Sequence, residues 1–244
     1  MPRSQGRGVF VWAIARRAAL ERGMKPRELI GTAIVPGGEE LRLYRRDSDY
    51  MIVLGGNELM SSRMSGSEQA LAVMTYERLP GRNAPHLLIG GYGMGFTLRA
   101  ALSVLGPEAR VTIAEIVPGI LDWARGPMAA LTAGCLDDPR VALIVDDVAD
   151  AIRASVKRYD AILLDVDNGP EGLSRAENDR LYAVGGLAAA KAALKPGGVL
   201  AIWSAGPDAS FARRLRHVGF KVEEVEVRAR AGKGARHVIW FAVA

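Results

Sequence analysis

Apolar and polar residues follow two different patterns along the chain. From residue 86 onward, short runs that are apolar throughout are separated by stretches in which apolar residues have helical spacing. Parallel strands that are covered on both faces have this uninterrupted apolar pattern. It predicts strands at 86–90, 111–115, 141–145, 161–165, 199–203, 221–227 and 237–243, and helices at 96–102, 119–133, 147–157, 181–194 and 211–218. We therefore expect an α/β, Rossmann-like seven-stranded sheet whose last two strands form an antiparallel pair at its edge.

In the first third of the chain, most apolar and polar residues follow each other in shorter runs. Alternating runs broken by turn residues at 29–62 predict a small N-terminal antiparallel β-meander, and 67–79 has the spacing of a helix. Residues 9–22 combine helical spacing with arginines, which fits an amphipathic helix or a poorly ordered arm, and Met24 is a plausible translation start. The expected organisation is a basic extension at 1–23, the meander and its helix at 24–82, and the Rossmann-like domain at 83–244.

Composition narrows the function classes. The formal charge is +5, but the basic excess is concentrated at the two ends of the chain, and no basic stripe with interleaved aromatics surrounds the predicted site, so nucleic acid is a disfavoured partner. No apolar run reaches the roughly 20 residues of a membrane helix. The single cysteine, Cys135, excludes an internal disulfide, and a reducing cytoplasm is the expected location.

A glycine-rich turn follows the first apolar strand. Gly91, Gly93 and Gly95 come directly after this strand, and Glu115 ends the next one. Glycines let a strand-to-helix turn approach a ligand closely, and an acid at the tip of the neighbouring strand can accept hydrogen bonds from both ribose hydroxyls. The arrangement predicts a nucleoside site, the alternative being glycines that serve only a tight turn.

Acidic residues also follow the third and fourth strands. Asp146 and Asp147 come after the third, where a carboxylate can accept a hydrogen bond from an adenine amino group, although Asp147 could instead be the N-cap of the next helix. Asp165 and Asp167 come after the fourth strand, and either can take a proton from a nucleophile. Asp167 could equally serve only a turn.

This order of elements resembles the S-adenosylmethionine-dependent transferase fold, and within it the spermidine synthase (polyamine aminopropyltransferase) family. The resemblance covers about residues 40–204 and rests on the meander, the glycine segment 90–95, Glu115, Asp147, Leu181-Tyr182 and the Leu-Lys-Pro-Gly-Gly segment at 194–198. It implies an adenosyl-sulfonium donor, a small acceptor such as an amine, and a homodimer. The implied donor contacts are Gly91, Tyr92, Gly93, Gly95, Glu115, Ile116, Asp146, Asp147, Val148 and Asp165. The implied acceptor contacts are Glu58, Glu68, Asn168 and Tyr182, and the implied catalytic residues are Asp165 and Asp167.

Three segments depart from that family. Its glycine segment carries an aspartate that holds the donor's amino group, and here Gly93 takes that place. Its catalytic segment, commonly Asp-Ser-Thr-Asp-Pro, reads Asp-Val-Asp-Asn-Gly-Pro at 165–170, so the second aspartate is either shifted to Asp167 or replaced by Asn168. The acidic and aromatic residues that grip a polyamine are missing at 64–70.

Three functions remain open from the sequence. The first is aminopropyl transfer from decarboxylated S-adenosylmethionine to an amine, and the second is methyl transfer from S-adenosylmethionine to a small molecule. The third is a non-catalytic binding module. The three histidines have no metal-ligand spacing, so no metal is expected. Trp203, at the end of the fifth strand, fits either the core or an acceptor pocket.

Overall fold

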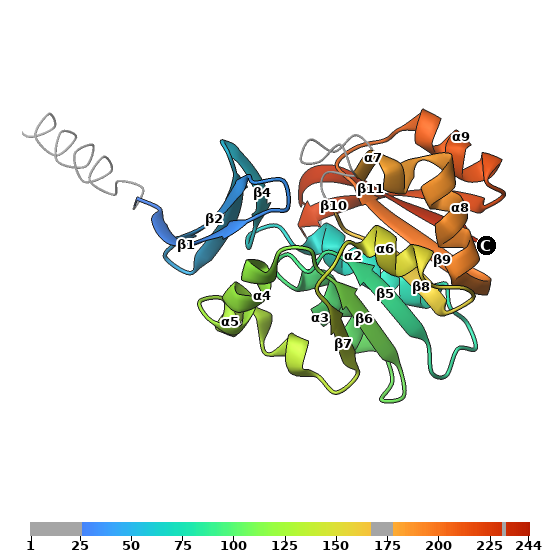
Figure 1. Cartoon of the computed structure of the whole chain (residues 1–244), viewed down its shortest axis with the longest axis horizontal. Helices are drawn as coiled ribbons and strands as arrows, with labels where there is room; N and C mark the ends of the chain where they lie inside the picture. Colours follow the sequence, from blue (N-terminus) through green and yellow to red (C-terminus); the bar gives the residue numbers. More distant parts are fainter. Residues whose placement is uncertain (1–25, 167–177, 231–232) are drawn as a thin grey trace, which may run out of the picture.

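The computed structural model describes residues 26–166, 178–230 and 233–244 and contains two β-sheets (Figure 1). The predicted helix at 9–22 lies outside these residues. The first sheet is antiparallel, with its strands in chain order: β1 (Glu28–Ile34), β2 (Glu40–Arg46), β3 (Asp49–Leu54) and β4 (Asn57–Ser61). Leu41 pairs with Leu54 and Leu43 with Ile52, so the alternate apolar residues of β2 and β3 share one buried face. The predicted meander is confirmed.

The second sheet has seven strands in the order β10-β11-β9-β8-β5-β6-β7. Its strands are β5 (His86–Gly90), β6 (Arg110–Ala114), β7 (Val141–Ile144), β8 (Tyr159–Leu164), β9 (Leu194–Ser204), β10 (Lys221–Arg230) and β11 (Lys233–Val243). The five strands from β9 to β7 are parallel, and β11 and β10 add to the β9 side as an antiparallel pair. The Rossmann-like α/β fold with an antiparallel edge pair is confirmed.

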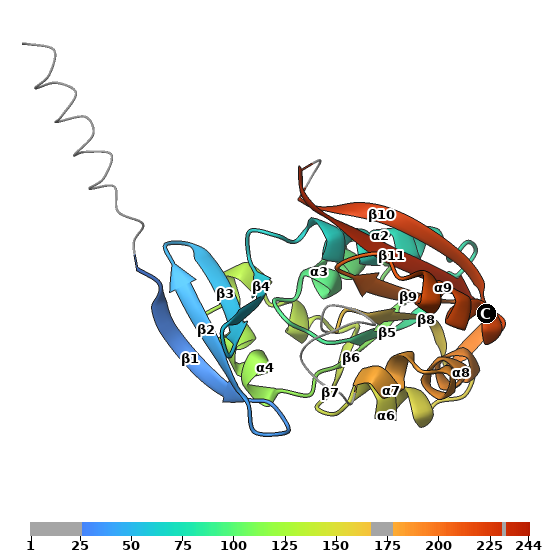
Figure 2. The same cartoon turned by 90° about the horizontal axis from the view of Figure 1, so that it is seen from above.

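Helices cover both faces of this sheet (Figure 2). The side chains of β5 alternate: Leu87 and Ile89 belong to one core cluster with residues of α2 and α3, and Leu88 belongs to another with residues of α6, α8 and α9. The helices are α2 (Gly66–Glu77), α3 (Phe96–Val104), α4 (Pro118–Arg125), α5 (Ala129–Thr132), α6 (Val148–Arg153), α7 (Asn178–Tyr182), α8 (Val184–Ala193) and α9 (Ala209–His217). Within the described ranges, no helix has the length and apolarity to cross a membrane.

Two predicted helices are each divided in two. The helix expected at 119–133 ends at Arg125 and resumes at Ala129, because Gly126 and Pro127 interrupt it and proline has no N–H to continue the hydrogen-bond ladder. The helix expected at 181–194 is broken at Ala183, whose backbone is extended. The chain then packs so closely that a Cβ at Gly186 would overlap the carbonyl groups of Arg180 and Leu181.

The small sheet is attached to the larger one through α4 and the turn after it. The Trp123 ring of α4 packs over Gly31 of β1, where a Cβ would lie only 2.8 Å from the ring nitrogen. The hydroxyl of Tyr50 on β3 donates a hydrogen bond to the carbonyl of Pro127. These contacts hold the small sheet over the carboxyl ends of the parallel strands, which is where open α/β sheets bind ligands.

Candidate active site

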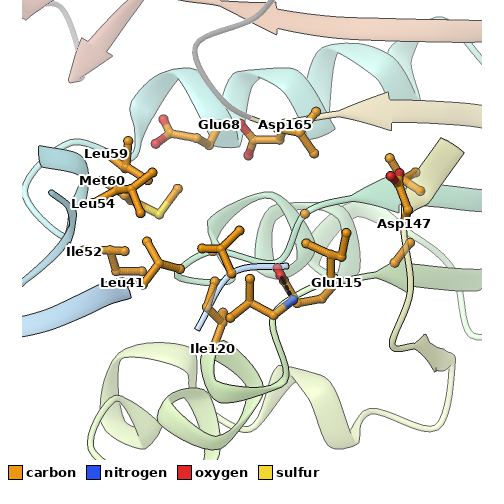
Figure 3. Close-up of a pocket in the computed structure, with 18 of the residues that line it drawn as sticks. Leu41, Ile52, Leu54, Leu59, Met60, Glu68, Glu115, Ile120, Asp147 and Asp165 are labelled. Atoms are coloured by element: carbon orange, nitrogen blue, oxygen red, sulfur yellow. Dashed lines mark hydrogen bonds between the residues drawn. The ribbon is translucent and has the colours of Figure 1, made fainter. Parts of the chain in front are cut away.

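A cavity of about 200 Å³ lies between the carboxyl ends of the parallel strands and the four-stranded sheet (Figure 3). Its floor comes from the segments that follow β5, β6, β7 and β8, the four strand ends that the sequence singles out. Of the predicted donor contacts, those that line it are Gly91, Gly93, Glu115, Ile116, Asp146, Asp147, Val148 and Asp165. The fold therefore brings together residues that are up to 74 positions apart in the sequence, from Gly91 to Asp165.

The glycine turn brings its backbone to the cavity. Gly91 has a φ of +79°, and a Cβ at this residue would lie 2.9 Å from the carbonyl oxygen of Asp165. Gly93 has a φ of +55°, and a Cβ there would lie 2.9 Å from the Sδ and Cε atoms of Met60. Both positions therefore need glycine, and they leave no side chain between the backbone and the cavity.

Glu115 connects the turns after β5 and β6. Its Oε2 accepts a hydrogen bond from the Tyr92 N–H at 2.8 Å, and its Oε1 accepts one from the Val117 N–H at 2.9 Å. The residue is only 4% exposed, and burial raises the pKa of its carboxyl group although these bonds favour the charged form. Glu115 is thus held rigidly at the tip of the second parallel strand, facing the cavity.

Asp147 has two roles. Its Oδ1 accepts a hydrogen bond from the Ala149 N–H at 2.8 Å, which makes it the N-cap of α6, and the residue also lines the cavity. The N-cap alternative is therefore confirmed without removing Asp147 from the site. Asp146 accepts a hydrogen bond from the Asp147 N–H at 2.8 Å. Ile116 and Val148 flank these carboxylates with apolar surface.

Glu68 and Asp165 lie beside each other on one wall of the cavity (Figure 3). Glu68 is in the first turn of α2, and burial together with the negative charge of Asp165 raises its pKa to about 7. Partial burial at the cavity raises the pKa of the Asp165 carboxyl group to about 6, against the opposing effect of a hydrogen bond from Thr97. Two adjacent carboxylates with raised pKa values form a group that can take up a proton near neutral pH.

A chain of hydrogen bonds supports Glu68. The Ser67 hydroxyl donates to Glu68 Oε2 at 2.7 Å, and His237 Nδ1 lies 2.9 Å from the same hydroxyl oxygen. When Glu68 is ionised it can only accept, so the hydroxyl hydrogen is directed to Glu68 and His237 donates through Nδ1. The His237 ring also contacts the Trp203 ring edge-on, with 4.7 Å between centroids. Trp203 lines the cavity, and its Nε1 is buried with no hydrogen-bond partner in the described part of the chain.

Several predicted site residues lie elsewhere. The Tyr92 side chain turns away from the cavity into the core, where its hydroxyl lies 3.3 Å from Cys135 Sγ, so only its backbone contributes to the site through Glu115. Tyr182 is buried against Phe211, and Glu58 is exposed on β4. Gly95 is the N-cap residue of α3 and does not line the cavity. Asp167 and Asn168 lie outside the described residues.

One wall of the cavity was not predictable from the sequence. The four-stranded sheet and the turn after β1 contribute six apolar side chains, which we call the apolar wall: Val35, Leu41, Ile52, Leu54, Leu59 and Met60. Apolar residues in a meander predict burial but not the partner they pack against. In the described parts of the chain, no group of three or more His, Cys, Asp or Glu residues is arranged to hold a metal ion.

The protein-family comparison matches residues 69–209, more than half of the chain, to the spermine/spermidine synthase domain. This chain belongs to the spermine/spermidine synthase family. The match ends before His237 and begins one residue after Glu68, so the supporting chain of Glu68, Ser67 and His237 lies outside the shared region.

Several curated relatives of this spermine/spermidine synthase family member are bacterial polyamine aminopropyltransferases. A polyamine aminopropyltransferase of Mycobacterium tuberculosis is 27% identical over 173 residues, which are 69% of this chain and 31% of the relative. A polyamine aminopropyltransferase 1 of Streptomyces coelicolor is 30% identical over 158 residues, which are 61% of this chain and 29% of the relative. The match thus spans about a third of the length of these relatives.

Solved spermidine synthases share the fold. A spermidine synthase in complex with the transition-state analogue AdoDATO matches with a TM-score of 0.71 and 19% identity, over 88% of this chain and 72% of that one. The spermidine synthase of Thermotoga maritima matches with a TM-score of 0.70 and 19% identity, over 93% and 83% of the two chains. At this level of identity the likeness establishes the fold.

Proposed function

We propose that the protein transfers an aminopropyl group from decarboxylated S-adenosylmethionine to a small amine. The observation that carries the proposal is the charge of the cavity. Its described lining contains five carboxylates, from Glu68, Glu115, Asp146, Asp147 and Asp165, and no Lys, Arg or His. A sulfonium and an ammonium suit such a site, whereas the carboxylate of intact S-adenosylmethionine would meet like charges.

The donor nucleoside fits the floor of the cavity. The side-chain-free backbone at Gly91 and Gly93 lets the donor approach closely, and Glu115 stands where it can accept hydrogen bonds from ribose hydroxyls. Asp147 accepts a hydrogen bond from the adenine amino group, and Ile116 and Val148 cover the ring faces. In this pose the sulfonium carbon faces the carboxylates of Asp165 and Glu68.

The chemistry requires a neutral amine. The amine nitrogen forms a bond to the propyl carbon as the bond from that carbon to sulfur breaks, and the electron pair goes to sulfur, which becomes a neutral thioether. The amine must first lose a proton, and the pair formed by Asp165 and Glu68 accepts it because its raised pKa values lie near neutral pH. The rigid site supplies alignment of nitrogen, carbon and sulfur. Asp167 remains a second candidate for proton transfer.

Calorimetric titration of the full chain with the two nucleosides tests this proposal. We expect decarboxylated S-adenosylmethionine to bind at least about 10-fold more tightly than S-adenosylmethionine, because the latter adds an anion to an acidic cavity. Tighter binding of intact S-adenosylmethionine would overturn aminopropyl transfer and favour methyl transfer. Absence of binding by both nucleosides would favour a non-catalytic module.

Assembly and location are part of the same proposal. The family resemblance supports a homodimer, and the single cysteine, Cys135, which is buried, suits a reducing cytoplasm. Light scattering of the purified chain measures the assembly, with a mass of one chain as the result that contradicts it.

A further inference from the structure

The Ser67 hydroxyl lies between two groups that can each accept its hydrogen. Its Oγ is 2.7 Å from Glu68 Oε2 and 2.9 Å from His237 Nδ1. Ser67 is fully buried, so bulk solvent does not compete for this hydroxyl. A hydroxyl has a single hydrogen to donate, and only one of the two neighbouring atoms can receive it. The other atom must either donate to Oγ or lose the hydrogen bond.

The tautomer of His237 decides the direction of this hydroxyl. Partial burial lowers the pKa of His237 below its ordinary value, so the ring is uncharged near neutral pH and carries one N–H. If that hydrogen is on Nδ1, His237 donates to Ser67 and the Ser67 hydrogen is left for Glu68. If it is on Nε2, the bare Nδ1 atom competes with Glu68 for the same hydrogen.

The His237 ring is held in place by Trp203. The two residues lie on β11 and β9, which are paired strands, with Ile239 opposite Trp203. Their rings meet edge to face, with an angle of 73° between the planes and 4.7 Å between the centroids. This contact restricts rotation of the imidazole. Nδ1 therefore stays directed at Ser67, which belongs to the first turn of α2.

The bond from Ser67 orients the Glu68 carboxylate in the cavity. It holds Oε2, and Glu68 is only 7% exposed, so the carboxylate has little freedom beside Asp165. Asp165 is the charged group that faces Glu68, whereas burial alone perturbs His237. A proton acceptor for the amine has to be ionised and correctly oriented. A hydroxyl turned toward His237 would withdraw its hydrogen bond from the ionised form of Glu68.

We propose that His237 is a positioning residue for Glu68, and that it acts as the Nδ1–H tautomer through the Ser67 hydroxyl. This inference rests on the proposed function, in which Glu68 and Asp165 take the proton of the acceptor amine. His237 does not line the cavity, so its contribution is indirect. It directs the hydrogen bond that holds the carboxylate ready for proton transfer.

Nitrogen NMR of the wild-type full chain tests the tautomer directly. Couplings between the ring protons and the two ring nitrogens distinguish Nδ1–H from Nε2–H. We expect His237 to carry its hydrogen on Nδ1 at pH 8.5, which is above the pKa of about 7 of Glu68. The Nε2–H tautomer at this pH overturns the proposal. This measurement needs no substrate and no variant, so it remains decisive if a substitution at residue 237 unfolds the protein.

Two substitutions separate the hydrogen bond from the packing. His237→Asn and His237→Leu both remove the ring that contacts Trp203, but the asparagine amide nitrogen is attached at Cγ, as Nδ1 is, and can donate to Ser67. We expect His237→Leu to raise the pKa of Glu68, measured by carbon NMR titration, and His237→Asn to leave it close to the wild-type value. His217→Leu, which changes an exposed residue of α9, is the control. An equal pKa of Glu68 in the asparagine and leucine variants overturns the proposal.

Steady-state rates with decarboxylated S-adenosylmethionine and 1,4-diaminobutane measure the effect on transfer. We expect His237→Leu to lower kcat on the order of 10-fold, with the KM for the nucleoside within about 2-fold of wild type, because orientation and not donor binding is lost. His237→Asn should restore kcat to within about 3-fold. Equal losses of kcat in the two variants would mean that only packing matters, and this result overturns the positioning role.

The two proposals can fail separately. A wild-type protein that carries out no transfer but shows the Nδ1–H tautomer and the expected difference in the pKa of Glu68 would contradict the proposed function and leave the hydrogen-bond arrangement standing. Normal transfer by His237→Leu would contradict the positioning role and leave the proposed function standing.

Discussion

The Thr97 hydroxyl donates a hydrogen bond to Oδ2 of Asp165, with 2.6 Å between the two oxygen atoms. Thr97 lies in the first turn of α3, directly after the glycine turn, so the segment that forms the proposed nucleoside site also positions the proposed proton acceptor. The bond favours the charged carboxylate and opposes the burial that raises the pKa of Asp165 to about 6. Thr97 therefore affects the fraction of molecules in which the Asp165 carboxyl group is ionised near neutral pH.

Thr97→Val should move the acid limb of the pH profile to higher pH. Without the hydroxyl, the pKa of Asp165 rises above about 6, and we expect kcat/KM to begin its decline about one pH unit earlier as the solution is acidified. Steady-state rates measured between pH 5 and 9 check this. Ser103→Ala is the control, because that hydroxyl, also on α3, donates to the Ala100 carbonyl and does not line the cavity. An acid limb at the same pH in Thr97→Val would mean that Asp165 is not the titrating group.

Ser67→Ala should raise the pKa of Glu68 above its value of about 7. The Ser67 hydroxyl stabilises the charged form of Glu68. When it is removed, burial and the negative charge of Asp165, which both favour protonation, are opposed less strongly. Carbon NMR titration of the Glu side chains measures the shift. Ser65→Ala, which removes a hydroxyl bonded to the exposed Gln69 amide, is the matched control. If the pKa of Glu68 were the same in Ser67→Ala as in the wild-type protein, the hydrogen bond from Ser67 to Glu68 would be contradicted.

Glu68→Gln should increase stability by an amount that grows with pH. The pKa of Glu68 is raised from 4.5 to about 7 in the folded protein, so between these values the folded state binds more protons than the unfolded state. Stability contributed by this group is therefore present at low pH and is lost as pH rises toward 7. Urea unfolding at pH 5 and pH 7.5 should show a larger gain for Glu68→Gln at pH 7.5. An equal gain at both values would show that Glu68 has an ordinary pKa.

Glu115→Gln should weaken both donor binding and folding. A glutamine amide has one acceptor oxygen, so the N–H of either Tyr92 or Val117 loses its buried partner, at a cost of about 1–3 kcal/mol in the free energy of unfolding. We also expect the affinity for decarboxylated S-adenosylmethionine to fall about 10-fold or more, because a charged acceptor is lost. Denaturant unfolding and calorimetry measure the two effects. Glu108→Gln, which changes an exposed residue, is the control. If Glu115→Gln bound the donor with the affinity of the wild-type protein, the proposed contact between Glu115 and the ribose would be excluded.

The floor of the cavity was predictable because strand ends are visible in the sequence. An acid that directly follows an apolar run, such as Glu115 or Asp165, lies at the carboxyl edge of a parallel sheet wherever the strands pair. The direction of an individual side chain was not predictable. Tyr92 sits in the glycine turn like a ligand contact, but its ring packs into the core beside Cys135, because the turn curls over it.

The apolar wall and the support of Glu68 depend on tertiary contacts. Leu41 and Ile52 have the alternation of a half-buried meander, but nothing in that pattern says that the buried face closes a cavity. His237 reaches Ser67 across 170 positions of sequence, and no local pattern connects these two residues. Helix interruption at Gly126 and Pro127 was predictable in principle from proline chemistry, but the apolar periodicity of the segment hid it.

The two walls of the cavity are encoded in separate stretches of the chain, since the apolar wall ends at Met60 and the strand-end carboxylates begin at Glu115. Substitutions in the first stretch can therefore change the shape of one side of the cavity while the carboxylates on the other side stay in place. The two sides of the cavity can thus change independently of each other.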